Sequence, residues 1–402
     1  MDFRDTPAEA TFRTEVREFI KREHQDAGGE TAQSAAQAAS TGGAKALDAY
    51  KEWMKKLGSK GWVAPAWPKE YGGAGMTIME QFIFNEELAE ARAPRPGGIG
   101  ITMAGPTIIV YGTEEQKKEH LSGMLTGGKV WCQGFSEPGS GSDLASLQTR
   151  AVRDGDDYVV NGQKIWTTGA QYADRMILLA RTDADAPKHK GISYFLLDMK
   201  TPGVEVRPLV NMAGTSGFSE VFFDNVRVPR KDLLGEENRG WYVGTTTLDF
   251  ERSSIGTSIA QGQSVEDLIE WVKTSQNGPL TPTVRLELAE RWIEATSARL
   301  MSYQVISMQN RGLVPNHEAS AVKIYAAELN QRITNTSLKV TGLAGQLEPS
   351  RKDGDSATNR YAVKGGRFAR TYLQAVASTI AGGTSEINRG IIATRGLGLP
   401  RG

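Results

Sequence analysis

Apolar residues recur at helical spacing in the first third of the chain. Two runs, one near the N-terminus and one over residues 79–88, show steps of three and four that place apolar side chains on one helix face. The N-terminal positions are Phe12, Val16, Phe19 and Ile20. Residues 28–44, between the runs, are rich in Gly, Ala, Ser, Thr and Gln, so we expect a surface loop there. The pattern predicts a helical block over about residues 8–127.

The period changes in the middle of the chain. Short runs of β-branched and aromatic residues are bounded by turn residues, which is typical of strands. These runs are residues 158–162, 175–181, 193–198 and 220–223. Helical spacing returns after Gly235 and continues to about Thr394. The order predicts an α+β multidomain protein, with an N-terminal helical domain over 1–129, a middle β-domain over 130–235 and a C-terminal helical domain over 236–402.

Composition narrows the function classes. The 402 residues carry 47 Lys and Arg and 47 Asp and Glu, and this zero net charge argues against a nucleic-acid surface. The one cysteine, Cys132, excludes an internal disulfide and is best interpreted as a small buried hydrophobe, while the four histidines lack metal-ligand spacing. The polar start is unlike a signal peptide, and no run of about 18 apolar residues predicts a membrane span. We expect a metal-free, cytoplasmic protein.

Residues 135–143 read FSEPGSGSD and form a loop suited to an anion. Ser136 and Ser142 supply hydroxyls, while Gly139 and Gly141 let the backbone approach a pyrophosphate closely. The alternative is an ordinary loop that enters the β-domain.

Residues 163–169 read QKIWTTG and suit a flat ring system. Trp166 can cover a ring, and the neighbouring hydroxyl residues, among them Thr168, can bond to its edge. The alternative for Trp166 is a half-buried strand aromatic that packs in the core.

Residues 381–389 read AGGTSEINR and predict the start of a helix. Thr384 or Ser385 would cap it, and Glu386 would lie in the first turn, where free N–H groups favour a phosphate. A plain helix start is the alternative.

The three motifs together resemble the acyl-CoA dehydrogenases over almost the whole chain. The resemblance implies a β-barrel-like middle domain, a four-helix-bundle C-terminal domain and bound FAD. It places Phe135 and Ser136 at the pyrimidine edge, Ser142 near the pyrophosphate, and Trp166 and Thr168 at the isoalloxazine ring. The implied cofactor contacts are Phe135, Ser136, Gly141, Ser142, Trp166, Thr168, Thr384 and Glu386. The implied substrate contacts are Ser142, Arg252, Gly382 and Gly383.

The chain departs from the family at the catalytic base. The commonest family motif has a Glu where this chain has Gly382, and a Tyr where it has Ala381. Glu251 shares a predicted helix face with Leu248 and Ile255, which would raise the pKa of a carboxyl group and suit a general base. The isovaleryl-CoA and long-chain branches carry their base on this helix, immediately before an Arg, so the resemblance implies that Glu251 is catalytic. From the pattern alone, a solvated surface Glu is the alternative.

A second departure bears on assembly. Homotetrameric members carry an Arg-x-x-Phe-Gly segment and a Gln-x-x-Gly-Gly-x-Gly segment that reach the neighbouring subunit's FAD. The corresponding residues 277–282 and 339–345 lack the Arg, the Phe and the Gln. This resembles the heterotetrameric (α2β2) branch that oxidises sterol side chains and other bulky thioesters. A homotetramer, with one of these variable loops misaligned, is the alternative.

The expected activity is FAD-dependent α,β-dehydrogenation of an acyl-CoA thioester to the 2-enoyl-CoA. The acyl group is expected to be bulky, branched or steroid-bearing, and an electron-transfer flavoprotein is the expected acceptor. Two alternatives remain, namely a flavin oxidase or monooxygenase on the same fold and a weakly catalytic structural subunit. A nicotinamide enzyme is disfavoured because no Gly-x-Gly-x-x-Gly follows a predicted strand.

Overall fold

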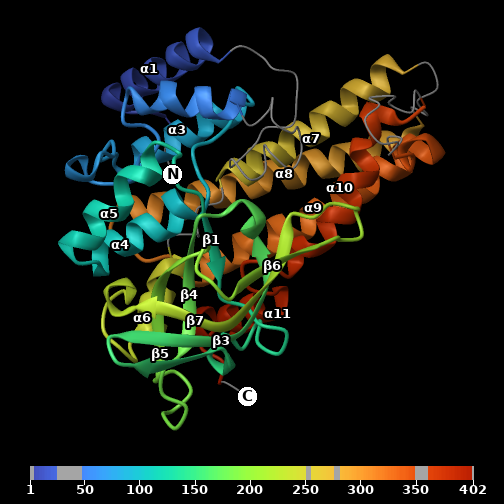
Figure 1. Ribbon diagram of the computed structural model, residues 1–402. Coiled ribbons are helices and arrows are strands. Elements are labelled where there is room, and N and C mark those ends of the chain that lie inside the picture. The colour runs from blue at the N-terminus through green and yellow to red at the C-terminus, as the bar shows by residue number, and fades with distance from the viewer. Residues whose placement is uncertain (1–3, 25–47, 250–254, 276–280, 349–360, 401–402) are drawn as a thin grey trace. The chain divides into compact units, whose positions relative to one another are not determined.

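The computed structural model describes the chain except for residues 1–3, 25–47, 250–254, 276–280, 349–360 and 401–402. Two compact units are present (Figure 1). The first comprises Met1–Phe84 and Ala91–Ser253, and the second comprises Asn85–Glu90 and Ser254–Gly402. The helix, sheet, helix order is confirmed, whereas the domain boundaries at 129/130 and 235/236 remain a prediction. The expected loop over residues 28–44 lies outside the described residues.

The first helices begin at residues that cap their free N–H groups. Thr6 precedes α1 (Pro7–Glu23) and accepts a bond from the Glu9 N–H, while the Glu9 carboxylate accepts from the Thr6 N–H at 2.7 Å. Thr113 caps α5 (Glu114–Leu125) in the same way. The buried residues of α1 are those of the predicted face, Val16, Phe19 and Ile20. Besides short 3-10 turns, the other helical stretches described before residue 250 are residues 48–58, α3 (Ile78–Glu90), the π-turn η2 (Gly100–Ala104), α4 (Gly105–Tyr111) and α6 (Gly240–Asp249).

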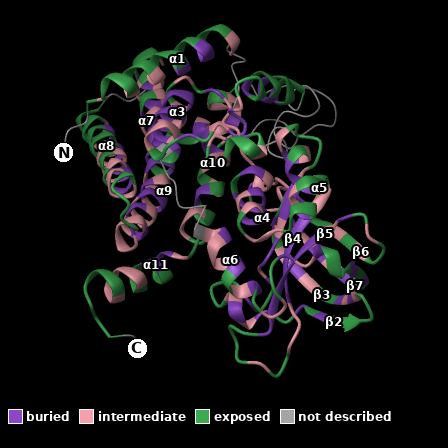
Figure 2. Ribbon diagram, turned by 90° about the vertical axis from the view of Figure 1, so that its left-hand side faces the viewer, coloured by how far each residue is buried: buried purple, intermediate pink, exposed green. Residues whose placement is uncertain are grey.

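A seven-stranded sheet forms the core of the first unit. Its strands are β1 (Trp131–Gly134), β2 (Arg150–Asp154), β3 (Asp157–Thr168), β4 (Arg175–Arg181), β5 (Ile192–Asp198), β6 (Val204–Leu209) and β7 (Phe218–Pro229). The order is β1-β4-β2-β3-β7-β6, and β5 also pairs with β4. The pairing of β1 with β4 is parallel, whereas β2–β3, β3–β7, β4–β5 and β6–β7 are antiparallel. Figure 2 shows β4 and β5 as mostly buried, because both faces of these strands are covered.

Buried hydroxyl groups hold α6 against the sheet. The Thr247 hydroxyl lies 2.9 Å from that of Thr107 on α4 and 3.2 Å from that of Tyr194 on β5. All three side chains are buried, so leaving these groups unpaired would destabilise the fold. The network fixes the helix that leads into the predicted base.

The second unit is a bundle of long helices. Its four main helices are α7 (Ile255–Thr274), α8 (Pro282–Asn310), α9 (His317–Gly345) and α10 (Arg367–Ala375). Two apolar clusters, one around Leu329 and one around Leu268, lie between them. The Arg299 guanidinium on α8 donates to Glu86 at 2.9 Å, which ties the last turns of α3 to this unit. A short helix, α11 (Ser385–Ile391), and a π-turn, η8 (Ile392–Gly396), follow.

Candidate functional site

Two of the predicted motifs are adjacent in the first unit. The Ile165 N–H donates to the Ser136 carbonyl at 3.0 Å, and the Lys164 ammonium donates to the Phe135 carbonyl at 3.0 Å. The first motif starts where β1 ends, and the second lies at the end of β3. The sheet therefore brings residues 135–136 beside residues 164–165.

Trp166 projects out of the first unit although it lies within a strand. The pairing of β3 with β7 shifts register between Lys164 and Thr167, and Trp166 has a φ of 61°. This irregularity leaves the indole 60 % exposed, with its ring edge-on to Phe218 at 6.2 Å. Thr168 is exposed as well. The alternative of a half-buried core aromatic is therefore wrong for Trp166.

The 135–143 loop presents hydroxyls and open glycines at the surface. A Cβ atom at Gly139 or Gly141 would meet no atom within 4 Å, while Ser142 is exposed and Ser136 is half-buried. Within the described residues, no side-chain hydrogen bond engages either serine. The Phe135 ring is buried against Tyr194, so Phe135 can contact a ligand only through its backbone. An exposed indole beside free hydroxyls and an open glycine loop fits a flavin.

The C-terminal motif folds as a tight turn into α11 in the second unit. Gly382 and Gly383 both have left-handed φ values, 65° and 84°, which favour glycine. Thr384 is the N-cap and accepts a bond from the Ile387 N–H at 3.2 Å, and exposed Glu386 lies in the first turn. The predicted cap is thus confirmed. The Lys323 ammonium donates to the Gly383 carbonyl at 2.6 Å and fixes the turn.

The predicted base and its neighbour lie outside the described residues. Helix α6 ends at Asp249 and α7 begins at Ile255, so Glu251 and Arg252 fall in the segment between them. Their catalytic and substrate-binding roles stay predictions. Of the assembly segments, residues 276–280 also lie outside the described part, while Gly342 in the other segment kinks α9 with a φ of 60°.

These motifs contain one buried ion pair for which the sequence predicted no role. The Lys164 ammonium, 0 % exposed, lies 2.7 Å from the Glu137 carboxylate. Burial lowers the pKa of Lys164 to about 8 against the opposing effect of Glu137. Burial also opposes ionisation of Glu137, but Lys164 and nearby hydrogen bonds outweigh it and keep the pKa of Glu137 low. The burial of Lys164 could have been predicted from the sequence. Lys164 lies an even number of residues along β3 from Tyr158 and Val160, which are buried.

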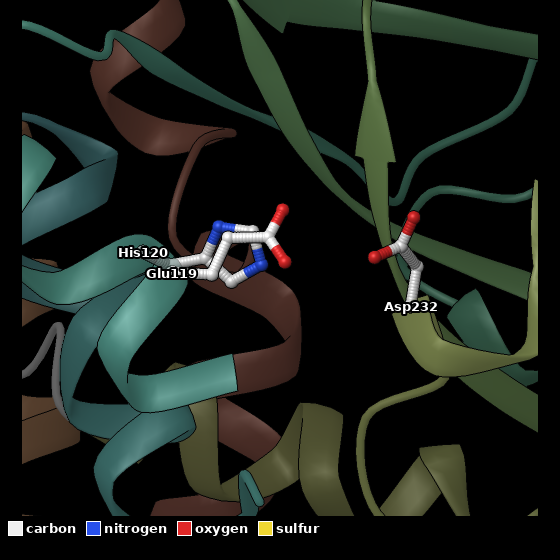
Figure 3. A group of neighbouring side chains, drawn as sticks. All are labelled: Glu119, His120 and Asp232. Atoms are coloured by element: carbon white, nitrogen blue, oxygen red, sulfur yellow. The ribbon is translucent and has the colours of Figure 1, made fainter. Parts of the chain in front are cut away.

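A second cluster, shown in Figure 3, brings together Glu119, His120 and Asp232. Their ligand atoms lie within 4.8 Å of one another, and Glu119 and His120 face Asp232 from the opposite side. Arg175 and Lys231 each approach the Glu119 carboxylate at 3.3 Å. Because both cations already lie against one of the three candidate ligands, Glu119, we assign no metal to the cluster. Burial lowers the pKa of His120 to about 4 and raises that of Asp232 to about 6.

Two further features concern expectations from composition. Cys132 is fully buried, and burial raises the pKa of its thiol, which agrees with a small hydrophobe rather than a nucleophile. Among the helices of the described ranges, none combines the length and apolarity needed to cross a bilayer.

Three family models match the chain in sequence order. Residues 6–128 match the N-terminal domain of acyl-CoA dehydrogenases, residues 132–226 match the middle domain, and residues 238–397 match the C-terminal domain.

Several curated proteins and solved structures resemble the chain over most of its length. The chain is 35 % identical to acyl-CoA dehydrogenase IpdE1 of Mycobacterium tuberculosis, over 89 % of this chain and 90 % of that one. It is 38 % identical to acyl-CoA dehydrogenase FadE26 of the same organism, over 88 % of each chain. The solved Tcur3481-Tcur3483 steroid ACAD has a TM-score of 0.84 at 35 % identity, with both chains fully covered. The ChsE4-ChsE5 complex from Mycobacterium tuberculosis has a TM-score of 0.82 at 35 % identity, again with full coverage of both chains.

Proposed function

The chain belongs to the acyl-CoA dehydrogenase family of oxidoreductases, which act on CH–CH bonds, and from this premise we propose that it oxidises a bulky acyl-CoA thioester to the 2-enoyl-CoA with bound FAD. The observation that carries the cofactor assignment is the outward-facing Trp166 beside the 135–136 backbone. An indole that the core does not use, next to free hydroxyls, suits the edge of an isoalloxazine ring.

The protein's task is to place the thioester and to move one proton. Glu251 takes the α-proton, and Arg252 together with the Gly382–Gly383 turn contributes to substrate binding. When bound, FAD would supply the redox chemistry, the two-electron oxidation of the thioester's Cα–Cβ bond. Trp166, Thr168 and the Phe135–Ser136 backbone would hold the ring, while Gly141, Ser142, Thr384 and Glu386 are the other proposed cofactor contacts. Holding these groups in place lowers the barrier by orientation.

The substrate class and the partners are inferred from the similar proteins and from the family residues that this chain lacks. One similar structure is a steroid ACAD, and another is the ChsE4-ChsE5 complex. Together with the missing Arg, Phe and Gln, this supports a branched or steroid-bearing acyl group and an α2β2 assembly with a second acyl-CoA dehydrogenase-like chain. An electron-transfer flavoprotein is the proposed acceptor. The buried, unpaired Cys132 suits a reducing, cytoplasmic setting.

The test of this function is flavin reduction by a panel of straight, branched and steroid-bearing acyl-CoA thioesters. Glu251→Gln should keep FAD and substrate binding but slow flavin reduction at least about 100-fold, the scale of general-base loss. Asp249→Asn, two residues earlier, is the matched control and should change little. Near-normal reduction by Glu251→Gln would remove the base assignment.

Exposure of the reduced protein to air separates a dehydrogenase from an oxidase. A dehydrogenase should reoxidise slowly in air and quickly with an electron-transfer flavoprotein. Fast reoxidation by oxygen alone would contradict the dehydrogenase proposal. If the purified chain shows no flavin absorbance at about 450 nm, even together with its partner, it would instead be a structural subunit.

A further inference from the structure

We propose that the Lys164–Glu137 ion pair positions the flavin by fixing the backbone at Phe135 and Ser136 before the cofactor binds. The inference rests on the proposed function, because it takes this backbone to face the flavin. Neither side chain needs to touch FAD, so both are positioning residues rather than catalytic ones.

The contacts of the pair join three segments. Lys164 on β3 donates to the Phe135 carbonyl at 3.0 Å and to the Glu137 carboxylate at 2.7 Å. The same carboxylate accepts from the Gln148 N–H at 2.6 Å and from the Thr149 N–H at 2.9 Å. One buried pair therefore connects the start of the motif loop, the segment that returns from it, and the strand that carries Trp166.

The backbone around Glu137 transmits this constraint to the proposed ring contacts. Glu137 and Ser140 exchange two backbone hydrogen bonds, at 2.9 and 3.0 Å, which close a narrow turn. Ser136 immediately precedes this turn, and its carbonyl accepts from Ile165, the neighbour of Trp166. A shift of Glu137 would therefore move both sides of the proposed flavin edge together.

A charged pair can orient a carbonyl group in a way that an apolar pair cannot. An ammonium group donates in several directions at once, and its bonds are strong because Lys164 is fully buried. Well-packed apolar residues can equal a buried ion pair in stability. The presence of this pair is therefore better explained by geometry than by stability.

The test uses Lys164→Met, Glu137→Gln and the double variant, in whichever assembly of the wild-type chain carries flavin. Each single change leaves a buried group unpaired and should destabilise the protein, whereas the double variant, which has no uncompensated charge, should recover part of the stability. The double variant should nevertheless bind FAD at least about tenfold more weakly, which corresponds to the loss of about one hydrogen bond. Its flavin absorbance bands should also shift.

Two further measurements separate positioning from stability. In flavin-free protein, the Ile165 amide should exchange with deuterium faster in the double variant than in the wild type, because its acceptor is no longer fixed. Glu86→Gln, which weakens the Glu86–Arg299 pair in the second unit, should lower stability but leave FAD affinity and spectrum unchanged.

The outcomes distinguish this inference from the proposed function. A stable double variant with wild-type FAD affinity, spectrum and Ile165 protection would overturn the positioning role while leaving the function intact. A wild-type assembly that binds no FAD would overturn the proposed function, and the positioning role with it.

Discussion

Trp166 shows how one backbone irregularity can set the role of a side chain. The register shift in β3 turns its indole away from the core, so the fold depends little on it. Trp166→Phe and Thr168→Ala should change the flavin spectrum or reduction potential while lowering stability by less than about 1 kcal/mol. Spectroscopy, redox titration and urea unfolding would measure these effects.

The control for this prediction is Val160→Ala, a fully buried position on the same strand. It should lower stability by at least about 1 kcal/mol and leave the flavin unchanged. A large stability loss in Trp166→Phe with an unaltered flavin would contradict the prediction.

His120 and Asp232 should show opposite pH dependences that largely cancel. The pKa of His120 falls from 6.5 to about 4 on folding, so its contribution to stability is lost as pH drops from 6.5 to 4. The pKa of Asp232 rises from 3.8 to about 6, so its contribution grows as pH drops from 6 to 3.8. The effect is at most about 3.4 kcal/mol for His120 and about 3 kcal/mol for Asp232.

Replacing one partner should reveal the other. His120→Gln should become more stable, relative to wild type, as pH falls from 6.5 to 4.5, and Asp232→Asn should become less stable. Urea unfolding at several pH values measures both. Parallel pH profiles for the wild type and the two variants would show that these groups do not titrate as described.

Individual site residues were predicted from sequence where local chemistry decides them. The Thr384 cap needs only a hydroxyl before a helix, and the exposed hydroxyl of Ser142 needs only a glycine-rich loop. The role of Lys164 could not be predicted in this way, because its partner comes from another segment that only the sheet brings near. The outward turn of Trp166 likewise depends on the irregular pairing of β3 with β7.

At the scale of elements, the hydrophobic periodicity predicted where several strands and helices lie. The runs at 175–181 and 193–198 correspond to β4 and β5, and the run at 79–88 lies within α3. The pattern could not give the sheet order, since β1 pairs with β4 in parallel across more than 40 residues of chain.

Helix α8 carries an apolar stripe on its exposed face. Leu286, Ile293 and Leu300 are 68 %, 64 % and 47 % exposed and lie seven residues apart, which places them nearly in line. Figure 2 shows exposed residues along much of this helix. Seven-residue spacing is typical of packing against another helix, so we expect this stripe to contact another chain of the proposed assembly.

Ile293→Glu should therefore weaken the assembly at least about tenfold without unfolding the chain, because a charge would replace an apolar contact. Analytical ultracentrifugation of the co-expressed complex measures the change. Val152→Glu, an equally exposed apolar position on β2, is the control and should leave assembly intact. Equal effects of the two variants would argue against an interface at α8.

At the scale of the whole molecule, the missing Arg, Phe and Gln predict dependence on a partner. FAD without those contacts would lose charge-assisted hydrogen bonds worth about 1.5–3 kcal/mol each. We expect the chain expressed alone to be flavin-poor or poorly soluble, and co-expression with a second family member to give α2β2 with two FAD per four chains. Mass photometry with flavin quantification would test this. An active homotetramer with one FAD per subunit would contradict it.

The pairing of β3 with β7 also limits how early this part of the sheet can form while the chain is being synthesised. Roughly 60 residues separate the start of β3 from the start of β7, and β3 lacks this neighbour until β7 emerges. At about 5–20 residues per second, β3 waits roughly 3–12 s for it on the ribosome. During that interval the inward side chains of Tyr158 and Val160 are uncovered on one flank. Growth at a lower temperature, or added chaperone, should therefore raise the yield of folded chain more than a stronger promoter does.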